Sequence, residues 1–184
     1  MQDLLTAIHE SAHIVIADLF GLRFGDAKIT DRALGYGECV LYMPHAQEIL
    51  SLDVPGRQLC EPSTFSVDSK VLFFVLAAGS CAETLVYKPD SPTVETFGDD
   101  QCKMDKVVRF REKHCPQGDS PELLVMILCS FLRVPEVLTC IRSLAERLLS
   151  SGGSMKGKDL AEFLGSNAAY SIYRTKMQIQ TDGA

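Results

Sequence analysis

The chain has 184 residues, 46% of them hydrophobic, which is enough to bury a substantial core in one domain. Its 18 basic and 24 acidic residues give a net charge of -6, the wrong sign for a surface that binds nucleic acid. We therefore expect one domain, residues 1–184, that does not bind nucleic acid.

Two apolar runs, residues 71–79 and 123–132, are too short to cross a bilayer and indicate buried helices. Acidic residues interrupt the first apolar run of the chain, which is unlike a signal peptide. The seven cysteines have irregular spacings and no CxxC pair, which is typical of reduced thiols, and Cys81, Cys129 and Cys140 fall at apolar helical positions. These features predict a protein without a membrane span, located in the cytoplasm.

The first elements follow from hydrophobic periodicity. Apolar residues recur at three- and four-residue steps over residues 3–20, which predicts a helix that ends at Gly21. Short runs with β-branched residues predict strands at residues 27–30 and 36–42. Residues 44–69 contain several prolines and little periodicity, and so predict a loop with one short helix.

The rest of the chain has a mainly helical pattern. A buried helix is predicted from Ser69 to the Lys88-Pro89 pair, followed by a loop at residues 90–98. Further helices are predicted at residues 100–113, from Ser120 to an interruption at 133–136, from there to 149, and at 159–176, with a flexible turn at 150–157. The predicted fold class is mainly α with a small β-sheet (α+β).

The first predicted helix carries the motif HExxH at residues 9–13. Residues four apart lie on one face of a helix, so His9 and His13 can reach the same metal ion, with Glu10 beside them. Zinc lowers the pKa of a bound water to about 7. Glu10 can then accept the proton of that water as it attacks a carbonyl group.

Chance would supply about 0.005 HExxH matches in a chain of this composition. Half of the four histidines of the chain fall within the motif. The structural alternative is a pair of core histidines next to an incidental glutamate. We interpret the motif as a zinc site.

A catalytic zinc site needs a third protein ligand and keeps an open position. The longer HExxHxxGxxH pattern is absent, so the third ligand must come from elsewhere in the chain. The candidates are Glu83, Asp99, Asp100, His45 and His114.

Three segments resemble, in the same order, the peptidase domain of FtsH-type ATP-dependent zinc proteases. Residues 6–13 (TAIHESAH) resemble its catalytic helix, residues 32–36 match its RALGY strand, and residues 75–87 (VLAAGSCAETLVY) resemble its VLLGGRAAEELVF helix. The resemblance covers about residues 5–113 and implies a zincin-type HExxH helix. It includes no ATPase domain, residues 44–69 differ from the family, and the helices predicted over residues 120–176 carry none of its motifs.

The resemblance also implies roles for individual residues. The third ligand of the family is an aspartate in a TGAxxDL segment, which corresponds to Asp100, and Asp99 is the neighbour most easily confused with it; either residue can alternatively be a helix N-cap. Glu83 matches the first acidic residue of the AAEE segment and is expected to orient a zinc histidine. An ion pair or a solvated helix face is the alternative for Glu83.

In the family, the RALGY strand borders the active-site cleft. Leu34, Gly35 and Tyr36 are therefore expected to form an edge strand that binds an extended peptide through backbone hydrogen bonds. The alternative is a strand that only completes the sheet.

The resemblance and the motif together predict a zinc metallopeptidase that binds Zn²⁺ through His9, His13 and Asp100, with Glu10 as the catalytic base. Because no motor domain is included, the expected substrates are peptides, unfolded proteins or proteins delivered by a partner. A homo-oligomer and a separate ATPase partner are both compatible with this interpretation. The alternative from another class is an inactive zinc-binding interaction or regulatory module, although a structural zinc site would not need Glu10.

Overall fold

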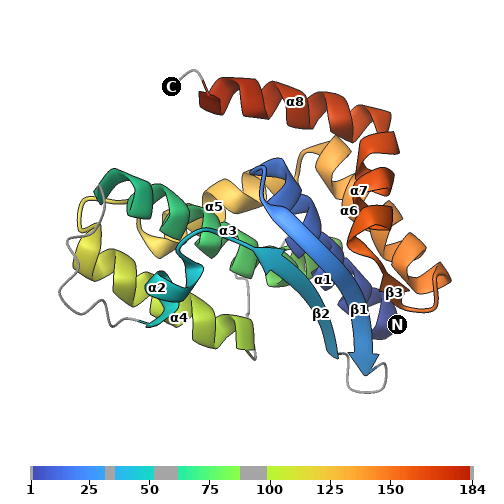
Figure 1. Ribbon diagram of the computed structural model, residues 1–184, viewed down its shortest axis with the longest axis horizontal. Helices are drawn as coiled ribbons and strands as arrows, with labels where there is room; N and C mark the ends of the chain where they lie inside the picture. The colour runs from blue at the N-terminus through green and yellow to red at the C-terminus, as the bar shows by residue number, and fades with distance from the viewer. Residues whose placement is uncertain (1, 32–35, 52–61, 88–98, 183–184) are drawn as a thin grey trace.

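The computed structural model describes residues 2–31, 36–51, 62–87 and 99–182, which form a mainly helical fold with one small antiparallel sheet (Figure 1). The elements are α1 (Gln2–Leu19), β1 (Arg23–Asp31), β2 (Tyr36–Tyr42), α2 (Ala46–Ser51), α3 (Pro62–Tyr87), α4 (Asp99–His114), α5 (Pro121–Leu132), α6 (Pro135–Ser150), β3 (Ser154–Met155), α7 (Gly157–Ser166) and α8 (Ala168–Asp182). The expected α+β class is confirmed.

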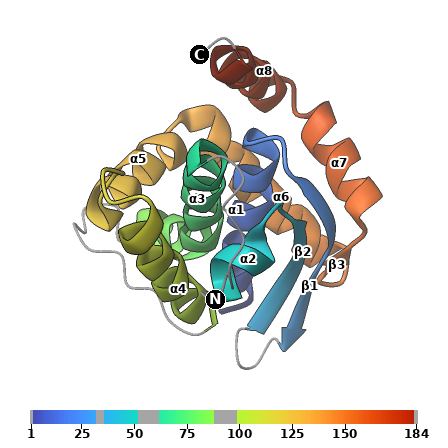
Figure 2. The same ribbon diagram turned by 60° about the vertical axis from the view of Figure 1, so that its left-hand side comes forward.

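Helix α1 lies at the centre of the fold, where it contacts the sheet, α3 and α6 (Figure 2). Its residues 14–17 are completely buried. Burying one aliphatic side chain of this size stabilises a fold by about 1.5–3 kcal/mol. At its C-terminal end, Asp18 accepts hydrogen bonds from Tyr170 (2.9 Å) and Arg174 (2.9 Å) of α8. Helix α1 is therefore a rigid base for the side chains that it carries.

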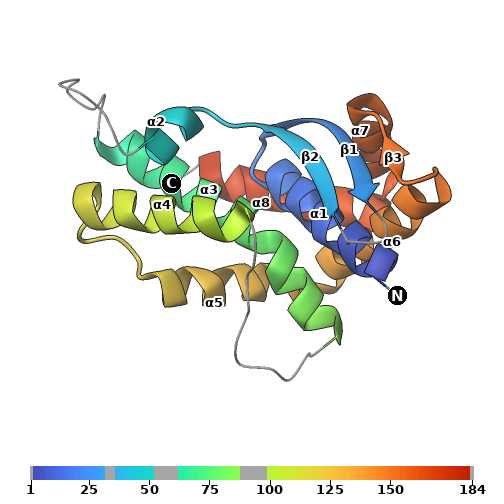
Figure 3. The same ribbon diagram turned by 90° about the horizontal axis from the view of Figure 1, so that it is seen from below.

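The sheet has the strand order β2-β1-β3, and its two long strands lie across α1 (Figure 3). β1 and β2 pair antiparallel, with Ala27 opposite Cys39 and register irregularities on both sides of that part of the ladder. On its other edge, β1 pairs with the short strand β3. β2 is therefore an edge strand of the described sheet.

Helix α3 packs against α1, α4 and α5, and residues 72–82 are buried. Its segment Thr64–Val86 is long and apolar enough to cross a membrane by length and composition, but 67% of that apolar window is buried inside the protein. Helices α5 and α6 pass the same test only as a pair, and they bend by 78° at the break between them. Pro135 begins α6, where a helix can accommodate proline. The burial of α3 is the pattern of a core helix.

Three sequence predictions differ from the structure. α3 begins at Pro62 instead of Ser69, so the end of the predicted loop is helical, which agrees with the preference of proline for the first position of a helix. The predicted last helix is two helices, α7 and α8, because Asn167 has extended backbone (ψ 92°) and its side chain accepts a hydrogen bond from the Tyr170 N–H. The predicted flexible turn at 150–157 contains β3, which forms only through its long-range pairing with β1.

Candidate metal centre

His9 and His13 lie one turn apart on α1, and their ring centroids are 4.6 Å apart. The Nε2 atom of each ring lies 3.1 Å from Oδ2 of Asp100, at the start of α4. One ligand atom from each of the three residues lies within 4.8 Å of the others. Ligand atoms of a tetrahedral zinc ion lie about 3.3 Å apart, given bonds of about 2.0–2.1 Å. The three side chains can therefore hold a metal ion.

The other ring nitrogen of each histidine is held by α3. His13 Nδ1 donates to the Val75 carbonyl oxygen (2.6 Å), and His9 Nδ1 donates to Oε1 of Glu83 (2.7 Å). Acceptors of this kind fix the tautomer and the ring orientation of metal-binding histidines. Both Nε2 atoms are thereby left facing Asp100.

Asp99 and Asp100 occupy the first turn of α4 but point differently. The Asp99 side chain is 79% exposed and forms an ion pair with Lys103, one turn along the same helix. The Asp100 side chain is 21% exposed and faces the two histidines. Of the two aspartates, Asp100 alone joins the group that can hold a metal ion.

The Glu10 carboxylate is buried next to this group without being part of it. A Cβ atom placed on Gly37 of β2 would lie 2.6 Å from Glu10 Cγ, so the backbone of the strand packs directly against this side chain. The Cys39 thiol, on the same strand, donates a hydrogen bond to the carboxylate. Burial raises the pKa of Glu10, and the charges of His13 and His9 and the Cys39 hydrogen bond oppose this rise.

The carboxylates around the histidines favour a positive charge at this position. Burial lowers the pKa of His9, but hydrogen bonds to Asp100 and Glu83 outweigh burial and bring that pKa to about 10. Burial also opposes the ionisation of Asp100, yet the hydrogen bonds from His13 and His9 lower its pKa below the ordinary range. The same carboxylates would stabilise a metal cation.

The approach of α3 to α1 depends on a glycine. A Cβ atom at Gly79 would overlap the imidazole ring of His9, at ring atom Nε2 among others. No larger residue fits here while His9 keeps its position.

The sequence did not predict a role for three residues of this site. Gly79 lies in a segment that resembles the family but was given no role, and Gly37 and Cys39 were given none either. Glycine spacing alone does not reveal which glycines a second helix or strand will approach.

The remaining predicted residues lie elsewhere. Tyr36 begins β2, whereas Leu34 and Gly35 lie outside the described residues. His45 faces α3 and hydrogen-bonds Asp68 (2.7 Å), and His114, at the end of α4, lies against the Phe110 ring. Neither of these two histidines belongs to the group that can hold a metal ion.

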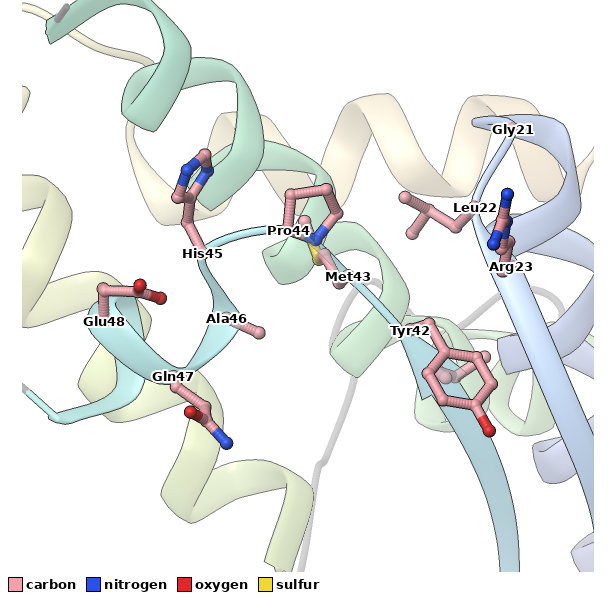
Figure 4. Close-up of a pocket in the computed structure, with 11 residues that line it drawn as sticks. Gly21, Leu22, Arg23, Tyr42, Met43, Pro44, His45, Ala46, Gln47 and Glu48 are labelled. Atoms are coloured by element: carbon pink, nitrogen blue, oxygen red, sulfur yellow. The ribbon is translucent and has the colours of Figure 1, made fainter. Parts of the chain in front are cut away.

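A cavity of about 700 Å³ lies between the start of β1 and the segment from the end of β2 into α2 (Figure 4). Arg23 and Tyr42 stand at one side, and Gln47 and Glu48 at the other, with Met43 and Pro44 between them. Its lining includes no residue of the candidate metal group. This cavity and the candidate metal group are therefore separate features of the structure.

Comparison with known proteins adds no identification. A scan of the sequence against models of known protein families finds no match, and a search of curated proteins finds no significant match.

The two neighbouring aspartates provide a test of the third ligand. We expect Asp100→Ala to weaken zinc binding at least about tenfold, because even changes to residues that only support a ligand cost 10–100-fold in metal affinity. Asp99→Ala removes an exposed charge at a helix N-terminus, worth about 0.3–1 kcal/mol of stability, and its exposed ion pair with Lys103, but no group that faces the histidines. Competition with a chromophoric zinc chelator measures both affinities. The reverse order would assign the ligand role to Asp99.

Proposed function

We propose that this chain is a zinc-dependent metallopeptidase in which His9, His13 and Asp100 hold the metal. The observation that carries the proposal is the arrangement of nitrogen and carboxylate groups: two Nε2 atoms converge on one carboxylate oxygen, while both Nδ1 atoms are held by acceptors on α3. Two imidazoles and one carboxylate are a zinc ligand set that leaves a fourth position open.

Glu10 is the catalytic base in this proposal. Its carboxylate is buried beside the metal group, and Gly37 and Cys39 of β2 hold it in place. A bound zinc ion supplies a Lewis acid that acidifies water and polarises a carbonyl group. Glu10 accepts the proton of the attacking water and passes it to the leaving amine as the peptide bond breaks.

The FtsH-peptidase-like assignment is part of the same proposal, and the placement of the three resembling segments supports it. The HExxH segment lies on α1, the VLAAGSCAETLVY segment on α3 brings Gly79 and Glu83 to His9, and Asp100 comes from the start of the next helix. RALGY leads into β2, although residues 32–35 lie outside the described part. The sequence order and the spatial meeting of these segments agree with a single catalytic site.

An unstructured peptide is the proposed substrate. In the described sheet β2 pairs only with β1, so its outer edge has backbone groups that an extended peptide can pair with. The same strand carries Gly37 and Cys39 against Glu10, which places its backbone beside the proposed base. A peptide that pairs with this edge would lie along the strand whose Gly37 packs against Glu10.

Metal removal tests the proposed activity. We expect the zinc-loaded chain to cleave fluorescently labelled casein. Treatment with 1,10-phenanthroline should reduce cleavage to background, and added zinc should restore it. The isomer 1,7-phenanthroline, which does not chelate, controls for non-specific inhibition. If the zinc-loaded chain does not cleave casein or a diverse library of unstructured peptides, a zinc-binding interaction module replaces the peptidase.

A further inference from the structure

A further cavity, of about 330 Å³, is lined by residues of α3, α4 and α5 and of the loop that joins α4 to α5 (Figure 3). Its apolar lining residues come from all three helices and the loop: Phe73, Val108, Pro116, Pro121 and Leu124. Ligand pockets in proteins typically measure about 300–1,000 Å³, so this cavity has the size for a small molecule.

A buried cation also lines this cavity. Arg111 of α4 is only 6% exposed, yet it forms no ion pair with any described residue. Its hydrogen bonds within the described part of the chain both come from Nη1, to the Ser66 carbonyl oxygen (3.1 Å) and to the Ser69 hydroxyl (3.0 Å) of α3. Arginine is almost never fully buried unless it is paired. The N–H groups of Nε and Nη2 can therefore bind an anion that the described chain does not supply.

The carboxylates that line the cavity are engaged elsewhere, and the free edge of the guanidinium borders the cavity. Asp119 forms an ion pair with Lys70 (2.7 Å), and Glu112 is exposed to solvent. A Cβ atom on Gly118, another lining residue, would lie 2.7 Å from Nη2 of Arg111. Nη2 therefore lies beside the cavity wall, on the opposite side of the guanidinium from the contacts that Nη1 makes with α3.

We infer that this cavity binds a small organic monocarboxylate with an apolar body, whose carboxylate pairs with Nε and Nη2 of Arg111. This edge of a guanidinium presents two parallel N–H groups, which match the two oxygens of a carboxylate. Arg111 supplies one positive charge and Asp119 lines the same cavity, so a singly charged anion fits better than a dianion such as phosphate. The cavity shares no residue with the candidate metal group, so this inference does not depend on the proposed peptidase function.

Calorimetric titration of the full chain with 2-naphthoate tests the inferred chemistry. We expect one bound molecule per chain. The uncharged 2-naphthamide has the same apolar body and should bind about 10- to 100-fold more weakly, because hydrogen bonds between charged groups contribute a difference of that size. Inorganic phosphate should also bind more weakly. No binding of 2-naphthoate, equal affinity for the amide, or tighter binding of phosphate would each overturn the inference.

Cysteine alkylation locates the bound molecule without any mutation. Cys115 lines the cavity and is partly exposed, whereas the exposed Cys102, in the first turns of α4, is not a lining residue. 2-Naphthoate should slow the reaction of iodoacetamide with Cys115 and leave the reaction with Cys102 unchanged, as followed by mass spectrometry. A molecule held by the metal centre would not protect Cys115, and that result would contradict the inference.

Variants test the contribution of Arg111 itself. Arg111→Lys keeps a positive charge but lacks the two parallel donors, so it should bind 2-naphthoate at least about tenfold more weakly. Parent-like affinity of this variant would remove Arg111 from the site.

A second variant leaves Arg111 and its contacts with α3 intact. Val108→Phe enlarges a side chain of the cavity wall and should prevent binding. Val67→Phe makes the same change at a position of α3 that is 61% exposed and outside the lining, and it should bind 2-naphthoate as the parent does. Thermal unfolding confirms that each variant is folded. Parent-like affinity of Val108→Phe would place the ligand outside this cavity and overturn the inference.

Discussion

Gly79→Ala should fold but fail to hold zinc with the affinity of the parent. The added methyl group would overlap the His9 imidazole, and the α3 backbone cannot yield because residues 72–82 around it are buried. The His9 side chain must therefore rotate away, which breaks its hydrogen bond to Glu83 and removes Nε2 from Asp100. The expected loss of zinc affinity is at least about 10–100-fold, the range found when only a supporting residue is changed.

The fold itself should tolerate this substitution. Alanine favours a helix over glycine by about 1 kcal/mol, and the atoms that the methyl group meets belong to a side chain that can move. Gly165→Ala is the matched control, because a Cβ atom at Gly165 in α7 meets nothing within 4 Å. Zinc content after dialysis and thermal unfolding should be measured for both variants. If Gly79→Ala retains zinc as the parent does, the described position of His9 is not the metal-binding one.

Glu10→Gln should retain zinc and lose hydrolysis. Glutamine has nearly the size of glutamate, so it fits the space against Gly37, and Glu10 is not part of the metal group. The change removes the charge that accepts a proton, and general-base catalysis typically contributes about 10²- to 10⁴-fold. Casein cleavage should fall by that factor while zinc stoichiometry stays at that of the parent.

A measurement of thermal stability distinguishes this loss of hydrolysis from damage to the fold. Burial raises the pKa of Glu10, so its charge is stabilised less in the folded protein than in water, and a neutral amide of the same size should not lower the stability of the fold. Glu48→Gln, at an exposed position of α2 outside the metal group, is the control and should leave cleavage unchanged. Equal cleavage by the parent and Glu10→Gln would remove the catalytic role of Glu10.

The sequence alone predicted the parts of the fold and of the candidate site that depend on neighbouring residues in the chain. The 3.6-residue periodicity predicted α1, and the spacing of His9 and His13 on that helix predicted that both rings face one side. Asp100 could not be chosen from spacing, because its approach to α1 depends on how α4 packs; the family resemblance pointed to it instead. The structure then shows that Asp99 points outward.

The features that were missed all depend on contacts between distant segments. Gly37 and Cys39 reach Glu10 only because β2 lies across α1, and Val75 accepts from His13 through a backbone carbonyl that has no sequence signature. β3 has two residues and exists only through its pairing with β1. Local pattern carries little information about such contacts, whereas it defines a long amphipathic helix well.

Zinc X-ray absorption on the zinc-loaded full chain tests the central claim most directly. The seven cysteines are the main competing ligands, and zinc–sulfur bonds of about 2.3 Å are distinguishable from zinc–nitrogen and zinc–oxygen bonds of about 2.0–2.1 Å. We predict one zinc ion per chain, bound by two imidazole nitrogens and one carboxylate, with an exchangeable water and no sulfur. A shell that contains sulfur, or one closed by four protein ligands, would contradict the proposed catalytic centre.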